Sequence, residues 1–151
     1  MKPTEQLQLQ HEQLMAIFDE IEFTADSAER IRLAGHLAER IKAHSAVEEE
    51  IFYPAVEKVA APAARQMVNE ALEAHRAIDV LLDELLGSEL TPAAVKVLRG
   101  ALEEHIADEE ARLFPIITEQ LGDEAQTKLG TRIERFAEDL DEEDESVFVS
   151  P

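Results

Sequence analysis

The sequence predicts an all-α protein, an up-down-up-down four-helix bundle with a short extra helix at its C-terminus. Its 151 residues suffice for one domain with a sizeable core, and 45% are hydrophobic, with only five glycines and six prolines. Apolar residues recur at steps of three and four through four long segments, which is the spacing of one face of an α-helix. The connections between these segments are short, so neighbouring helices should run antiparallel.

The first two predicted helices each carry histidine on an apolar face. Thr4 can cap the first helix. The apolar face of this helix, called its seam from here on, is formed by Leu7, His11, Leu14, Phe18 and Ile21. Asp26 and Glu29 form a capping box before the second helix. The seam of that helix reads Leu37, Ile41, His44, Glu48, Ile51 and Ala55.

The next two predicted helices repeat this pattern. Pro62 lies near the start of the third helix, whose seam reads Val68, Leu72, His75, Leu82 and Leu86, widened by Ala71, Ile78 and Leu85. Thr91 and Pro92 supply a cap and a first-turn proline for the fourth helix. Its seam reads Val95, Leu98, Leu102, His105, Glu109, Leu113 and Ile116.

A shorter amphipathic helix is expected after the break at Gly122. Its apolar positions are Leu129, Ile133, Phe136 and Leu140. Aspartate and glutamate dominate residues 138–145, a composition typical of a solvated tail. We therefore expect one domain over residues 1–140 and a disordered acidic tail over residues 141–151.

The overall charge and composition exclude several classes of function. The formal net charge of −20 opposes binding to nucleic acid or to anionic lipid. The absence of cysteine excludes disulfides, thiolate metal sites, iron–sulfur clusters and thiol catalysis. The N-terminus is polar, and no apolar run is long enough to span a membrane. We expect a soluble cytoplasmic protein.

Two copies of a His-x-x-x-Glu motif indicate a metal centre. His44 and Glu48 form the first copy, followed by Glu-Glu-Ile-Phe-Tyr-Pro, and His105 and Glu109 form the second, followed by Glu-Ala-Arg-Leu-Phe-Pro. Residues four apart share one face of a helix. A single histidine precedes each copy, His11 and His75, so residues 1–60 and 62–121 form two related halves.

These four histidines and two glutamates fall on seams that should be buried. A buried, unpaired carboxylate would cost several kcal/mol, and the seams offer almost no arginine or lysine to pair with it. Imidazole and carboxylate together suit iron, zinc or manganese. Six ligands exceed one tetrahedral zinc site but suit two irons, each with two histidines, sharing both carboxylates and an oxo or hydroxo bridge.

Two other interpretations explain the pattern less well. A single seam histidine is usually a core residue with a hydrogen-bond partner, but four on four helices, two of them in one repeated motif, are not explained in that way. Ferritin-like di-iron bundles require Glu-x-x-His, and no histidine of this chain has glutamate three residues before it. His36 lies outside the repeat and is expected to be a surface or boundary residue.

With these residues, the chain resembles the hemerythrin-like family, also called His-His-Glu cation-binding domains, from about residue 4 to residue 121. The resemblance implies a four-helix bundle with a non-haem di-iron centre. Family roles include oxygen transport, sensing of oxygen or iron, and handling of peroxide or nitric oxide. The oxygen carriers have a further histidine one turn after that of the third helix, where this chain has Asp79. The cysteine module of the iron–sulfur repair members is absent.

Two residues are candidates for the missing ligand. Asp79 could ligate a metal or hydrogen-bond to His75. Tyr53, the only tyrosine, points away from His44 on an ideal helix, which favours simple packing at the bundle end. A π-bulge caused by Pro54 would instead turn Tyr53 towards the seam and make it a ligand.

Three functions remain open at this point. The missing fifth histidine favours reaction of the di-iron centre with hydrogen peroxide or another small oxidant, and a catalase-like decomposition of peroxide is one such reaction. The alternative is a protein that binds or senses oxygen, nitric oxide or iron without turnover. The third is a bundle with a purely structural metal pair.

Overall fold

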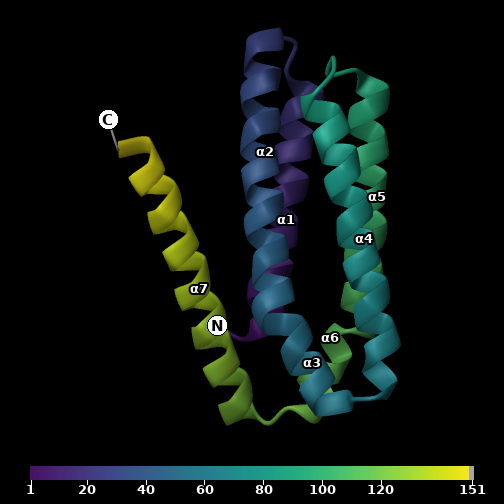
Figure 1. Ribbon diagram of the computed structural model, residues 1–151, viewed down its shortest axis with the longest axis vertical. Helices are drawn as coiled ribbons and strands as arrows, with labels where there is room; N and C mark the ends of the chain where they lie inside the picture. Colours follow the sequence, from purple (N-terminus) through teal and green to yellow (C-terminus); the bar gives the residue numbers. More distant parts are fainter. Residues whose placement is uncertain (150–151) are drawn as a thin grey trace.

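A computed structural model describes the backbone of residues 1–149 and the side chains of residues 1–142. Within these residues every regular element is a helix, as the predicted all-α class requires. Four long helices lie side by side in Figure 1: α1 (Pro3–Phe23), α2 (Ser27–Val47), α4 (Ala63–Leu86) and α5 (Pro92–Arg112). α1 and α4 each contact both α2 and α5, so every long helix has two long neighbours. Among the helices of residues 1–149, none has the length and apolar character of a membrane span.

Side-chain caps start two of these helices as predicted. Asp26 accepts a hydrogen bond from the amide of Glu29 at 3.4 Å, and Thr91 accepts one from the amide of Ala94 at 3.1 Å. The predicted cap at Thr4 is wrong, because α1 already begins at Pro3 and buries Thr4 in its first turn. The fixed φ of proline suits that first-turn position.

Prolines alter the second and fourth helices near one end of the bundle. α2 continues as η1 (Glu48–Phe52), a π-helical turn, and then as α3 (Tyr53–Ala60), in which Pro54 lies in the first turn. α5 ends at Arg112, and α6 (Phe114–Gln120) begins two residues later with Pro115 in its first turn. Proline has no amide hydrogen and clashes with the preceding turn, so regular α-helical bonding cannot pass through it.

The buried face shifts by one residue beyond each proline. Val56 and Ile117 are fully buried where the predicted seams had Ala55 and Ile116, which are half-buried. The third seam is also corrected at its end, since Leu86 is 46% exposed and Leu85 is buried in its place.

α7 (Asp123–Val149) has 27 residues and is longer than the short helix predicted. Residues 141–149 of the expected tail continue this helix, in keeping with the high helix propensity of glutamate, and residues 150 and 151 lie outside the described residues. The helix packs on α1, α2 and η1, with Leu129 and Ile133 buried. Figure 1 shows it outside the four long helices, beside α2. The domain boundary at residue 140 stays a prediction.

The hydrophobic core is divided into two clusters by a polar layer. The first cluster includes Leu7, Val47 and Ala71, and the second includes Leu14, Ile41 and Ile78. In three of the long helices, a histidine lies between a residue of the first cluster and a residue of the second: His11 in α1, His44 in α2 and His75 in α4. Apolar packing therefore bounds the histidine layer above and below along the length of the helices.

Candidate metal centre

The six residues predicted as metal ligands form one buried cluster inside the four long helices. None of them is more than 6% exposed: His11, His44, Glu48, His75, His105 and Glu109. Their ligand atoms form two groups, each within 4.8 Å, that could each hold a metal ion. The first group contains His11 and His44, the second contains His75 and His105, and both groups contain the two glutamates.

Each glutamate turns one oxygen towards each histidine pair. Oε2 of Glu48 lies 3.2 Å from Nε2 of His44, and its Oε1 lies 3.0 Å from Nε2 of His75. Oε1 of Glu109 lies 3.4 Å from Nε2 of His11, and its Oε2 lies 3.2 Å from Nε2 of His105. This is the arrangement that two carboxylates bridging a pair of ions would require.

The hydrogen-bonding pattern tests whether metal ions fit this cluster. Among the described residues, the buried atoms Oε2 of Glu48 and Oε1 of Glu109 have no hydrogen-bond partner, which is costly for a carboxylate. The two Nε2 atoms are 3.1 Å apart in the first histidine pair and 3.0 Å apart in the second, so only one ring of each pair can carry hydrogen there. Nitrogen ligands about 2.1 Å from one ion and at right angles are about 3 Å apart. The donors therefore suit metal ions.

Without cations, protons balance the buried carboxylate charges. Burial lowers the pKa of His11, but the nearby carboxylates of Glu109 and Glu48 raise it by more than burial lowers it, to about 10. The same opposing causes raise the pKa of His105 to about 9. Burial raises the pKa of Glu48, yet attraction to His44 and hydrogen bonds to its neighbours hold it well below its usual value. Metal ions would replace these protons, so binding should tighten as pH rises.

Three of the histidines are held from outside by a hydrogen bond at Nδ1. Nδ1 lies 2.7 Å from Glu110 in His11, 2.7 Å from Gln10 in His44, and 2.8 Å from Glu49 in His75. Such a bond fixes the ring and leaves Nε2 to the metal.

Sequence reasoning did not identify these outer partners. A signal existed for the two glutamates, because Glu49 and Glu110 each directly follow the glutamate of a His-x-x-x-Glu motif. No comparable pattern marks Gln10.

Tyr53 reaches the cluster through the π-helical turn. The amide of Tyr53 donates to the carbonyl of Glu48, five residues earlier, which rotates the tyrosine inwards. Its hydroxyl donates to Oε2 of Glu109 at 2.7 Å and lies 3.1 Å from Oε1 of Glu48 and 3.1 Å from Nε2 of His75. Burial and the charges of the two glutamates raise the pKa of Tyr53 far above its usual value, so the phenol keeps its proton unless cations are close.

The other sequence candidates lie outside the cluster. Asp79 is exposed and does not belong to either group of ligand atoms, and Glu49 makes the contact with His75 that was one of the two alternatives for Asp79. His36 is exposed, as predicted. Phe114, which replaces Tyr53 in the second copy of the motif, stacks on the ring of His11 with centroids 5.9 Å apart.

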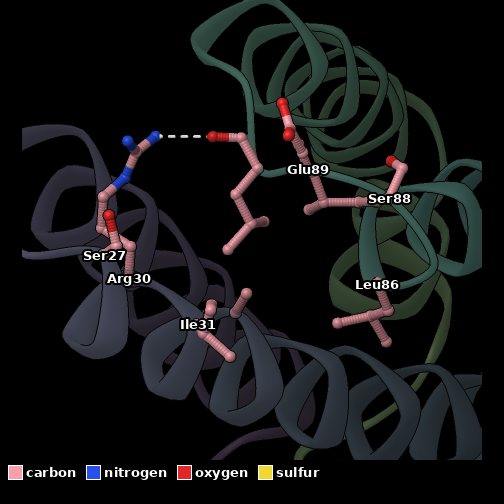
Figure 2. Close-up of a pocket in the computed structure, with 9 residues that line it drawn as sticks. Ser27, Arg30, Ile31, Leu86, Ser88 and Glu89 are labelled. Atoms are coloured by element: carbon pink, nitrogen blue, oxygen red, sulfur yellow. Dashed lines mark hydrogen bonds between the residues drawn. The ribbon is translucent and has the colours of Figure 1, made fainter.

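A separate cavity of about 560 Å³ lies between the start of α2 and the end of α4, at the end of the bundle opposite to α3 and α6. Arg30 donates a hydrogen bond of 3.1 Å to the carbonyl of Leu90, and this bond is the dashed line in Figure 2. No residue of the histidine cluster lines this cavity, so it is not part of the candidate metal centre.

The comparisons with known proteins agree with this geometry. The chain matches the family model described as "Hemerythrin HHE cation binding domain" over residues 2–117, a range that contains all six clustered residues. A hemerythrin HHE cation binding domain-containing protein from Mycobacterium kansasii is similar in structure, with a TM-score of 0.76 and 23% identity, covering 92% of this chain and 89% of that chain. At that identity the likeness shows the fold alone. No curated protein matches the sequence. From the family match over most of its length, the chain belongs to the hemerythrin HHE cation-binding domain family.

Proposed function

We propose that the cluster holds two iron ions with an oxo or hydroxo bridge, and that this centre reacts with hydrogen peroxide or another small oxidant. His11 and His44 would hold one ion and His75 and His105 the other, while Glu48 and Glu109 bridge both. Bound iron supplies Lewis acidity and a change of oxidation state. The surrounding helices α1, α2, α4 and α5 would form the up-down-up-down bundle, a topology supported by their short connections.

The observation that carries this proposal is the position of the Tyr53 hydroxyl. It lies within 3.1 Å of Glu48, His75 and Glu109, where an ion held by His75 and His105 would find a fifth donor. A phenolate is a hard anionic ligand and favours oxidised iron. It therefore supports chemistry with peroxide and opposes stable oxygen binding by a reduced iron pair.

The two halves of the cluster, one around His11 and His44 and the other around His75 and His105, would have different tasks in the reaction. Phe114 offers no ligand atom beside His11, so the first half keeps a position for an external molecule. Decomposition of two hydrogen peroxide molecules to two waters and one oxygen molecule needs no further reductant. The apolar clusters on both sides of the histidine layer exclude bulk water from this position.

A binding or sensing role for oxygen, nitric oxide or iron is the alternative. One contact favours it, because η1, which carries Glu48, packs against α7. A change in the cluster could thus reach the C-terminal helix. The expected cytoplasmic location also belongs to this proposal and stays a prediction.

The test combines metal content with two gas measurements. The full chain, expressed with ample iron, should contain about two irons and evolve oxygen from peroxide without losing its visible spectrum. The reduced protein should form no reversible oxygen complex. One zinc and no iron per chain would overturn the di-iron proposal, and a reversible oxygen complex without peroxide turnover would favour the alternative.

A further inference from the structure

The repeat places an equivalent outer groove behind one histidine of each pair. The groove behind His44 lies between α1 and α2, and the groove behind His105 lies between α4 and α5. Their linings correspond residue by residue in the two halves: Gln10, Gln13, Leu14 and Arg40 in the first, and Ala74, Ala77, Ile78 and Ala101 in the second.

The first groove is filled and the second is open. Two cavities of only about 10 Å³ each remain beside His44, and Leu140 and Asp141 of α7 line one of them. Asp141 is also paired with Arg40 at 3.1 Å, which holds α7 over this face. The groove beside His105 has a volume of about 380 Å³, and no described residue of α7 lines it. Three alanines in place of two glutamines and an arginine account for the difference.

His105 also lacks the outer hydrogen bond that holds the other three histidines. Gln10 accepts from Nδ1 of His44 at 2.7 Å, and its equivalent in the second half is Ala74, which has no acceptor. Among the described residues, the hydrogen bond and the ion pairs of His105 are all made by its Nε2. His105 is only 6% exposed and lines the groove.

The rim of the open groove is acidic. Glu70, Glu104 and Asp108 line it. Arg112 pairs with Glu70 at 3.0 Å and with Asp108 at 3.2 Å, so one cation faces three carboxylates. A negative rim raises the local concentration of cations and disfavours anions.

We propose that the α4–α5 groove is the route by which metal ions enter and leave the centre, and that His105 is the ligand that moves to let them pass. This inference rests on the proposed two-ion centre. Turning His105 into the groove breaks no outer hydrogen bond and enters free space, whereas turning His44 would break its bond to Gln10 and meet filled packing. The ion held by His75 and His105 should therefore exchange first.

The rate of iron release tests the proposal. The full chain is loaded anaerobically with iron(II) and mixed with a coloured iron(II) chelator, and the wild type should release one ion fast and one slowly. Ala74→Gln supplies the missing acceptor and should slow the fast phase by about 10–100-fold, the range of outer-partner effects on metal sites. Val80→Gln, at a 57% exposed position of the same helix, is the matched control and should leave both phases unchanged.

A second variant keeps the test decisive if Ala74→Gln does not fold. Gln10→Ala adds no bulk, frees His44 and should speed the slow phase until the two rates approach each other. If two ions are bound and neither variant changes their release rates, the inference about the groove is overturned, while the proposed two-ion centre is not. A wild-type chain that binds no metal would instead overturn the proposed function, so the two failures are distinguishable.

Discussion

The two halves of the cluster, around the pair His11 and His44 and around the pair His75 and His105, contain the same residue types and differ in their surroundings. In the first half, Phe114 stacks on His11, Gln10 holds His44, and α7 covers the outer face. In the second half, the Tyr53 hydroxyl enters the cluster, and nothing among the described residues holds Nδ1 of His105 beside its open groove. The repeated residues thus build a pair of candidate sites, and the residues that break the repeat make the surroundings of the two sites differ.

Glutamate variants should have the largest effect on this pair of sites. Glu48 and Glu109 each face both histidine pairs, so Glu48→Ala or Glu109→Ala should remove both irons, whereas His11→Ala or His75→Ala should leave about one. Elemental analysis of the purified variants measures this. Glu50→Ala, in the same π-helical turn but exposed, is the control and should keep both irons. Two irons retained in either cluster-glutamate variant would show that the carboxylates do not bridge.

The metal-free protein should lose stability at alkaline pH. The folded-state pKa values of His105 and His11 are raised to about 9 and about 10 from 6.5, so their stabilising protonation is complete below about pH 6.5 and is lost as pH rises through these values. The second half should be affected before the first. Thermal unfolding of metal-free and iron-loaded protein between pH 6 and pH 10 measures this. A metal-free Tm that rises over this range, or an equal fall in the loaded protein, would contradict the account.

The outer glutamates should act across the two halves. Glu49 follows Glu48 in η1 but holds His75 of α4, and Glu110 of α5 holds His11 of α1. Glu49→Gln should therefore weaken the second-half ion, and Glu110→Gln the first-half ion, each by about 10–100-fold. Competition with a chelator of known affinity gives both constants. An equal loss at both ions in each variant would argue against this division, and Glu50→Gln serves as the control.

Tyr53→Phe should have the smallest effect on metal content and the clearest effect on the spectrum. The variant makes position 53 resemble Phe114 and should keep both irons, because six ligands remain. Its phenolate-to-iron absorption in the visible should disappear. Since the pKa of Tyr53 is raised in the absence of cations, wild-type protein should show this band only after iron is added. An unchanged band in Tyr53→Phe would exclude the tyrosine as a ligand.

Residue type and local spacing were sufficient to predict the helices and the six clustered residues. His44 with Glu48 and His105 with Glu109 share a helix face because of the helical repeat alone, and their burial confirms the predicted seams. The caps at Asp26 and Thr91 are equally local.

Features that depend on packing between helices could not be predicted in the same way. The sequence left Tyr53 open because its direction depends on whether Pro54 induces a π-turn, and the one-residue shift at Val56 has the same origin. Asp79 was a candidate through its spacing from His75, but it is exposed, and Glu49 from another helix makes the contact instead. The full length of α7 was missed because an acidic composition suits both a solvated helix and a tail.

The most direct test of two unequal sites is a Mössbauer spectrum of the full chain loaded with the Mössbauer-active isotope of iron and then oxidised. The account predicts two quadrupole doublets of equal area, one from an iron with the Tyr53 phenolate and one from an iron without it. Tyr53→Phe should draw the two doublets together while their total area is unchanged. A single doublet in the wild-type protein, or one iron per chain, would contradict the central claim.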